Sequence, residues 1–190
     1  MKKITVITTL FMLGLAGGLY AQGANDDVEA TVDVVAAATI QTITDVDFGE
    51  ILATPVGTPT MDPAGAGTES NVTGTQTYGK LEIIGYVGAS VQVSVDKDST
   101  SLLTSTGGNA IRWNPDFAVD LDDTHGGATG ITLTNASPYT MDMSADATQY
   151  IWVGGTLAQP DNSALSAQTA GTYSTTNAAN GTITVSVVYN

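Results

Sequence analysis

The chain has 190 residues, no cysteine, one histidine and a formal net charge of −14. Only five residues are Lys or Arg, against 19 Asp and Glu, so the chain lacks the cationic surface that binding to phosphate backbones or anionic lipid requires. The absence of cysteine excludes disulfides, zinc–thiolate sites and cysteine nucleophiles. We therefore expect no nucleic-acid partner, and a core held together by burial and hydrogen bonds alone.

The N-terminus has the pattern of a secretory signal peptide. Met1-Lys2-Lys3 is a positively charged start, Ile4 to Leu19 is an apolar stretch, and Ala21 offers a small residue at the cut. We expect cleavage after Ala21 and a mature chain, 22–190, that forms a single domain; an uncleaved N-terminal anchor is the alternative. No second apolar run of about 18 residues follows. We therefore expect export through the inner membrane to the periplasm, the cell surface, a fimbrium or the medium, with no direct membrane insertion after cleavage.

The mature chain reads as a series of β-strands. Thr and Val, which favour strands, are abundant, and turn residues recur about every 8–12 residues, as in a sandwich or barrel. The first strand is expected at Val28–Val34, where apolar and polar residues alternate. Further strands are predicted at 39–44, 46–52, 60–62, 80–87, 90–95, 130–135, 150–157, 171–174 and 182–189, with short ones near Leu102 and Phe117. This pattern predicts an all-β fold, an antiparallel immunoglobulin-like β-sandwich of about nine strands.

Several short blocks occur along the mature chain in an order that one protein family shares. They are Val46-Asp47-Phe48-Gly49-Glu50-Ile51, Thr60-Met61-Asp62-Pro63-Ala64-Gly65, Val153-Gly154-Gly155-Thr156-Leu157, and Gly171-Thr172-Tyr173-Ser174 followed by 181–190. Together they resemble domain-of-unknown-function family 4402, a family of bacterial secreted domains; Thr175 to Asn180 is an insertion within its closing block. That family is similar in layout to pilin-type subunits, many of which, unlike this chain, carry a disulfide. The resemblance implies secretion and a pilin-like β-sandwich, but no particular activity.

The two alternating ends of the mature chain suggest a mode of assembly. The N-terminal strand, 22–35, either pairs within its own sheet or is donated to a neighbouring subunit by β-strand addition. The exchange candidates are Val28, Ala30, Val32 and Val34 on the donor strand and Ile183, Val185, Val187 and Tyr189 on the C-terminal strand. We therefore predict a structural or adhesive cell-surface subunit that polymerises with itself or with related subunits, assisted by a periplasmic chaperone and usher.

Acidic and aromatic residues suggest an alternative, a carbohydrate-binding module that depends on calcium. Four aspartates are candidate calcium ligands, namely Asp116, Asp120, Asp122 and Asp123. An EF-hand loop counted from Asp120 fails, because its sixth and twelfth positions are His125 and Ile131. Trp113 is the candidate for stacking on a sugar, whereas Trp152, inside an alternating strand, is expected in the core. A glycan is thus the alternative partner, and calcium is the one cofactor considered.

Catalysis is not expected. A Ser-His-Asp triad would have to use His125, which lies in the turn-like stretch 122–127 and is expected to be a solvated loop residue. Paired catalytic carboxylates need a preformed pocket that raises the pKa of one acid, and the sequence identifies no such pair. With no catalytic motif, we predict that the protein is not an enzyme and has no catalytic or organic-cofactor site.

Overall fold

The computed structural model describes residues 31–32, 34–65, 68–96, 101–134, 136–177 and 181–190. The chain divides into two compact units, Met1–Val34 and Val35–Asn190. In the first unit, Thr31, Val32 and Val34 form no strand, and Val32 and Val34 are 85% and 92% exposed. The expectation of a half-buried strand is therefore wrong at these positions, while Val28 and Ala30 lie outside the described residues.

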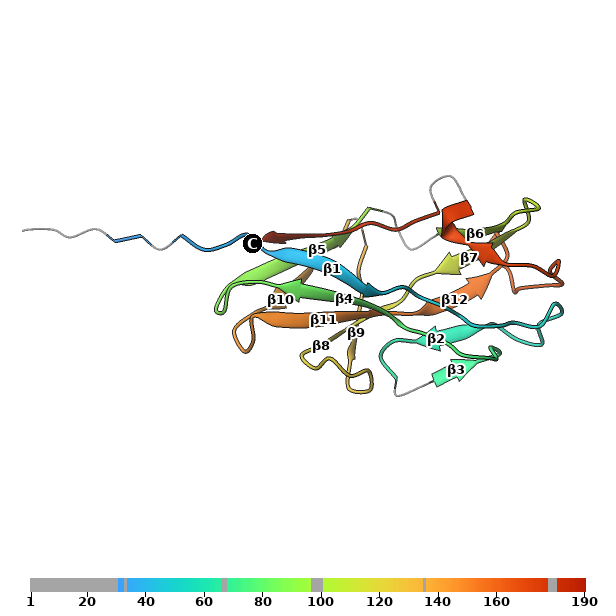
Figure 1. The fold of residues 1–190 in the computed structure, drawn as a ribbon, viewed down its shortest axis with the longest axis horizontal. Helices are drawn as coiled ribbons and strands as arrows, with labels where there is room; N and C mark the ends of the chain where they lie inside the picture. The colour runs from blue at the N-terminus through green and yellow to red at the C-terminus, as the bar shows by residue number, and fades with distance from the viewer. Residues whose placement is uncertain (1–30, 33, 66–67, 97–100, 135, 178–180) are drawn as a thin grey trace, which may run out of the picture. The chain divides into compact units, whose positions relative to one another are not determined.

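The second unit is an antiparallel β-sandwich. Every strand pairing among the described residues is antiparallel, and the strands form three sheets (Figure 1). In spatial order, the five-stranded sheet contains β1 (Thr39–Thr44), β4 (Gly79–Ile84), β11 (Thr148–Val153), β8 (Phe117–Asp120) and β9 (Thr129–Ile131). The three-stranded sheet contains β10 (Tyr139–Asp142), β5 (Ser90–Val95) and β14 (Val185–Tyr189).

The third sheet extends the sandwich beyond the ends of β8 and β11. Its six strands, in spatial order, are β13 (Tyr173–Ser174), β6 (Ser101–Ser105), β7 (Ala110–Asn114), β12 (Gly155–Ala158), β2 (Thr60–Asp62) and β3 (Thr68–Ser70). A short 3₁₀ turn, η1 (Thr175–Asn177), is the only helical element in the described part of the chain. No helix there has the length and hydrophobicity needed to cross a bilayer.

The sequence prediction of an antiparallel β-sandwich is confirmed, and β1, β2 and β5 have the predicted bounds. The fourteen strands among the described residues exceed the number of about nine that a simple sandwich suggests. Three of them, β3, β7 and β10, were not predicted. The predicted strand 46–52 instead forms isolated bridges from Asp47 to Thr77 and from Glu50 to Thr73. The predicted strand 150–157 is two strands, β11 and β12, in different sheets.

The break between β11 and β12 depends on two adjacent glycines. Gly155 has a φ of +130°, which L-residues rarely adopt. A Cβ on Gly154 would lie 2.2 Å from the Met61 carbonyl oxygen, and one on Gly155 would lie 2.1 Å from the Asn114 carbonyl oxygen. Glycine therefore allows the chain to leave β4 and β8 and continue between β7 and β2.

The main core lies between the five-stranded and three-stranded sheets. Alternation along β5 places Val91, Val93 and Val95 in it, as their predicted common face requires. Its other buried members are Ile83, Phe117, Leu133, Met141, Met143, Ile151 and Val153. A second, smaller core on the six-stranded sheet contains Ile111, Leu157 and Leu165. Because no disulfide crosslinks these layers, their stability depends on apolar burial.

Substitution of Gly155, which is surrounded closely by other atoms, should destabilise the fold much more than substitution of Gly126, which is not. Gly126 also has a positive φ, +146°, but a Cβ added there would have no atom within 4 Å. Both Gly126→Ala and Gly155→Ala introduce backbone strain, and only the second adds overlap with Asn114. We expect Gly155→Ala to lower the free energy of unfolding by about 2 kcal/mol more than Gly126→Ala, as measured by urea unfolding. Equal losses would show that crowding at the bend is unimportant.

Candidate functional site

Two long strand edges border the same side of the sandwich. β1 ends the five-stranded sheet and β14 ends the three-stranded sheet, and the Tyr189 hydroxyl donates a hydrogen bond to the Ala36 carbonyl at 3.0 Å. Neither strand contains a charged residue. The other described edge strands, β3, β9, β10 and β13, have only two to four residues, and β3 and β10 each carry an acid. Short length and charge discourage pairing with other chains, so β1 and β14 are the least protected edges.

The backbone of β14 is available on one side. Asp96 N–H donates to the Thr184 carbonyl, and Asn190 N–H donates to the Ser90 carbonyl, so the even-numbered residues bond toward β5. Successive residues of an antiparallel strand present their polar groups to opposite sides. The N–H and C=O groups of Val185 and Val187 therefore face away from β5, while their side chains are half-buried. An open backbone edge with inward apolar side chains is what β-strand addition requires.

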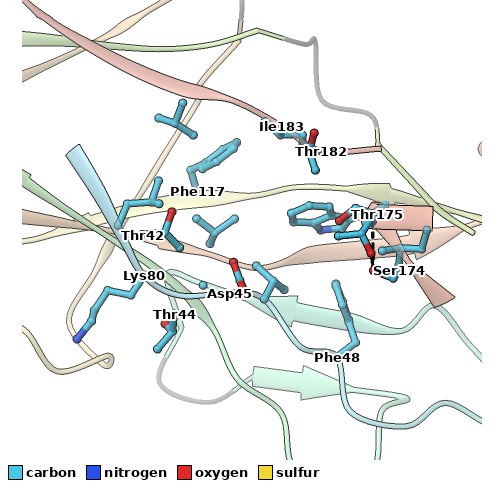
Figure 2. Close-up of a pocket in the computed structure, with 18 of the residues that line it drawn as sticks. Thr42, Thr44, Asp45, Phe48, Lys80, Phe117, Ser174, Thr175, Thr182 and Ile183 are labelled. Atoms are coloured by element: carbon cyan, nitrogen blue, oxygen red, sulfur yellow. Dashed lines mark hydrogen bonds between the residues drawn. The ribbon is translucent and has the colours of Figure 1, made fainter. Parts of the chain in front are cut away.

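A cleft of about 370 Å³ opens between the end of β1 and the residues that lead into β14 (Figure 2). Thr42 and Asp45 line one side, and Ile183 lines the other. Phe117 and Val153, which belong to the main core, also line the cleft. A segment bound here would therefore contact core side chains directly.

The C-terminal exchange candidates divide into two pairs. Ile183 and Val185 line the cleft. Val187 and Tyr189 do not line it, and they pack against the main core. The Tyr189–Ala36 hydrogen bond spans the gap at that end. The structure therefore brings half of the predicted acceptor positions to the opening.

Besides Phe117, three further aromatic residues line the cleft, and none of the four was predicted as an acceptor position. Phe48, Trp113 and Tyr173 come from three separate stretches of chain. Trp113 and Tyr173 belong to the six-stranded sheet, which the sequence pattern did not reveal, and Phe48 packs against the second core on that sheet. The Asp-Phe-Gly block was the available indication for Phe48: Asp47 Oδ1 accepts the Gly49 N–H at 2.8 Å and fixes a turn beside it.

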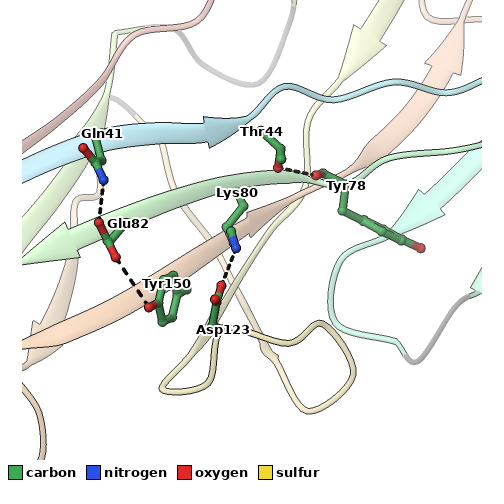
Figure 3. A network of polar contacts seen from close by, with 7 residues as sticks. All are labelled: Gln41, Thr44, Tyr78, Lys80, Glu82, Asp123 and Tyr150. Carbon is green, nitrogen blue, oxygen red and sulfur yellow. Dashed lines mark hydrogen bonds and ion pairs between the residues drawn. The ribbon is translucent and has the colours of Figure 1, made fainter.

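Hydrogen bonds on the outer face of the five-stranded sheet hold β1 in place (Figure 3). Gln41 Nε2 donates to Glu82 at 2.6 Å, and the Tyr150 hydroxyl donates to the same carboxylate at 3.5 Å. Thr44 Oγ1 donates to the Tyr78 carbonyl at 3.0 Å. These contacts join β1 to β4 and β11, so the β1 side of the cleft is attached to the sheet.

The four aspartates proposed as calcium ligands are not gathered at one point. Asp116 precedes β8 and Asp120 ends it. Asp120 accepts the Asp122 N–H at 3.1 Å, and Asp123 pairs with Lys80 (Figure 3). Within the described ranges, no three His, Asp or Glu residues form a group that could hold a metal. The arrangement gives no support to calcium binding, which stays a prediction.

His125 is packed rather than solvated, contrary to expectation. Its ring stacks on Tyr78, with centroids 4.0 Å apart, and meets the edge of Trp152 at 5.3 Å. Its Nε2–H donates to the Pro63 carbonyl at 3.0 Å. Trp152 is buried, as predicted. His125 thus fastens the acidic loop onto the outer face of the sheet, a role that strand periodicity cannot indicate.

Trp113, the sugar-stacking candidate, is half-buried and packs against both cores. Its indole N–H donates to the Gly154 carbonyl at 2.9 Å. The ring is therefore part of the cleft lining and not an isolated surface platform.

Comparison with known proteins adds no family assignment. The chain matches no model of a known protein family. No curated protein matches it either. The resemblance to family 4402 therefore stays a prediction, and the function must be argued from the cleft and its two edges.

The surroundings of Asp116 yield a prediction about pH. Burial, and then the charge of Asp62, raise the pKa of the Asp116 carboxyl. The pKa of Asp116 is thus higher in the folded state than its ordinary value of about 3.9 in the unfolded state. The free energy of unfolding therefore falls as the pH rises from the unfolded-state pKa through the folded-state pKa. Asp116→Asn should therefore stabilise the protein at pH 7 and have no such effect where Asp116 is protonated in both states. The gain should be small, because the side chain is also partly open to solvent, which screens its charge.

Asp161 provides the control of opposite sign. Hydrogen bonds from the Ser163 side chain and backbone lower the pKa of its carboxyl, so its ionised form stabilises the fold above the ordinary pKa. Asp161→Asn should therefore destabilise the protein at pH 7. Urea unfolding of both variants at pH 7 tests the pair, and a destabilised Asp116→Asn variant would contradict the prediction.

Proposed function

We propose that this protein is an exported structural or adhesive subunit of a bacterial cell surface, which accepts an extended segment of another subunit beside β14. The main observation in support is that the edge strand β14 has no charged residue and lies next to a cleft lined by residues of the main core. In β-strand addition, main-chain hydrogen bonds supply affinity and pockets for alternate side chains supply specificity. Val185 offers both, because its backbone faces the open side while its side chain lines the cleft.

The proposed occupant is residues 22–34 of a second copy. This segment contains Val28, Ala30, Val32 and Val34 at alternate positions, as a strand with one apolar face requires. Exposed valines such as Val32 and Val34 gain about 1.5–3 kcal/mol each when fully buried. Their exposure in the single chain supports a role in contacting another molecule.

Insertion is proposed to occur between molecules because the connection to β1 is unsuited to a reversal. Residues 35–38 are Val-Ala-Ala-Ala, which contains none of the Gly, Pro, Asn or Asp residues that favour turns. Ala36 accepts the hydrogen bond from Tyr189, and Ala38 packs against the main core. A segment returning to its own cleft would have to disturb these contacts.

Export and the proposed partners agree with this role. A secreted subunit with an unprotected edge needs its cleft covered before assembly, and a periplasmic chaperone followed by an usher would meet that need. The pilin-like layout that the sequence resemblance implies supports the same proposal. The alternative, glycan binding, is less well supported, because the Trp113 indole N–H is already bonded within the fold.

Complementation between two defective variants tests the proposal. Val34→Asp alters the donor segment at an exposed position, and Ile183→Asp alters the cleft. Loss of one buried valine should weaken assembly of the chain 22–190 about tenfold or more, as measured by sedimentation velocity. Each variant alone should therefore stay monomeric at concentrations just sufficient for wild-type assembly, but their mixture should form a 1:1 complex, because Val34→Asp retains an intact cleft and Ile183→Asp retains an intact donor segment.

Matched controls separate this interaction from general effects of charge. Thr31→Asp lies on the opposite face of the alternating segment, and Val188→Asp points outward from β14; both should assemble like wild type. Thermal unfolding should show a cooperative transition for Ile183→Asp, which establishes that this variant remains folded. A wild-type chain that stays monomeric, or a mixture that gives no complex, would falsify strand exchange. Glycan binding lost in Trp113→Ala would then favour the alternative.

A further inference from the structure

A second cleft of about 610 Å³ adjoins the first and lies against the six-stranded sheet. The two share Val46, Phe48, Leu103 and Tyr173 in their linings. We infer that they form one trough, and that the donated segment runs through both with Val34 in the second cleft and its acidic start beside β14. This inference rests on the proposed function and adds the extent and direction of the bound segment.

A hydrogen bond marks each end of the trough. Tyr189 bonds to Ala36 at the first-cleft end, and Gln168 N–H donates to the Ala53 carbonyl at 2.7 Å at the other end. The first cleft alone touches the C-terminal segment only at Thr182, Ile183 and Val185. That stretch is too short for the seven residues of the alternating segment 28–34. A bound segment must therefore extend away from Tyr189, into the second cleft.

The stretch 45–53 forms one side of the trough and is hydrogen-bonded to another segment of the chain. Asp47 and Glu50 each exchange two backbone hydrogen bonds, with Thr77 and Thr73 respectively. Phe48 lies between these two residues and Ile51 follows them, and both side chains are half-buried and pack against the second core. The stretch is therefore attached to the chain behind it at two points, while its apolar side chains line the trough.

The donor is long enough for the trough. The lining runs continuously along the chain from Asp45 to Ala53, and Thr42 and Thr44 extend it on β1. The twelve-residue stretch 42–53 could span at most about 40 Å, and the thirteen residues 22–34 span about 43 Å when extended. The donor thus has the length to occupy both clefts, and to exceed the first one alone.

The chain connection sets the direction. Charge does not, because acidic residues line both clefts and the Lys80 ammonium is paired with Asp123 on the outer face of the sheet. The acceptor's own chain enters β1 past Ala36, at the first-cleft end, so a donor that reaches its acceptor at the far end lets the subunits follow one another head to tail. Val34 then lies toward Ala53 and Gln168. The donating subunit continues from Val35 at that end of the trough, opposite the end at which the acceptor's own Ala36 lies, so each subunit can donate and accept at opposite ends.

Engineered cysteines test the direction without background, because the chain has no native cysteine. Leu52 lines only the second cleft and is 61% exposed. In assembled protein under mild oxidation, Val34→Cys with Leu52→Cys should form disulfides between copies, seen as ladders on non-reducing gels. Gly23→Cys with Leu52→Cys is the reversed-direction control and should remain uncrosslinked. Crosslinking in the control, or none in either pair, would overturn the inferred direction.

A substitution separates the second cleft from the proposed function. Leu52→Asp should weaken assembly about tenfold, whereas Val56→Asp, at a 92% exposed valine outside both clefts, should not. If Ile183→Asp abolishes assembly and Leu52→Asp leaves it unchanged, the segment ends in the first cleft and the inference is wrong, while the proposed function stands. If Ile183→Asp also has no effect, both fail.

Discussion

The pairing of β14 with β5 is the contact on which the candidate site depends. It uses the backbone groups of the even-numbered residues, as the bonds at Thr184 and Asn190 define, and leaves those of Val185 and Val187 on the open side. The same register turns the valine side chains inward. A shift by one residue would exchange the two faces and place Ser186 and Val188 at the core, so the cleft and the available backbone edge are one consequence of a single register.

The cleft reaches the main core of a protein that has no disulfides. Phe117 and Val153 lie at its floor and are buried already, whereas Ile183 and Val185 on its wall are only half-buried. Closing the gap with a longer β14 or with a turn before β1 would bury these two wall residues more completely. The chain instead has Val-Ala-Ala-Ala before β1, and the Tyr189–Ala36 hydrogen bond spans the gap at one end only. This combination favours completion of the sandwich by a segment from elsewhere.

The alternating strands were predictable, and the bends between them were not. Val91, Val93 and Val95 alternate with polar residues, so period-two patterning gave the bounds of β5 and its buried face. β11 and β12 read as one strand because both are apolar. Their separation depends on contacts of Gly154 and Gly155 with Met61 and Asn114, which are distant in sequence. The two adjacent glycines indicated that the backbone could bend here, but not in which direction the chain continues.

The candidate site was predictable on one side only. Ile183 and Val185 followed from alternation, whereas Trp113 and Tyr173 reach the cleft through the six-stranded sheet, whose short strands have little periodicity of their own. The open side of β14 is also a property of its neighbours, and a strand's own sequence does not reveal them. In the same way, His125 appeared turn-like in sequence because its partners, Tyr78, Trp152 and Pro63, come from other segments. Where a function depends on which strand is missing from a sheet, sequence can identify the candidate edges, but only the assembled sheet order can show which of them is unpaired.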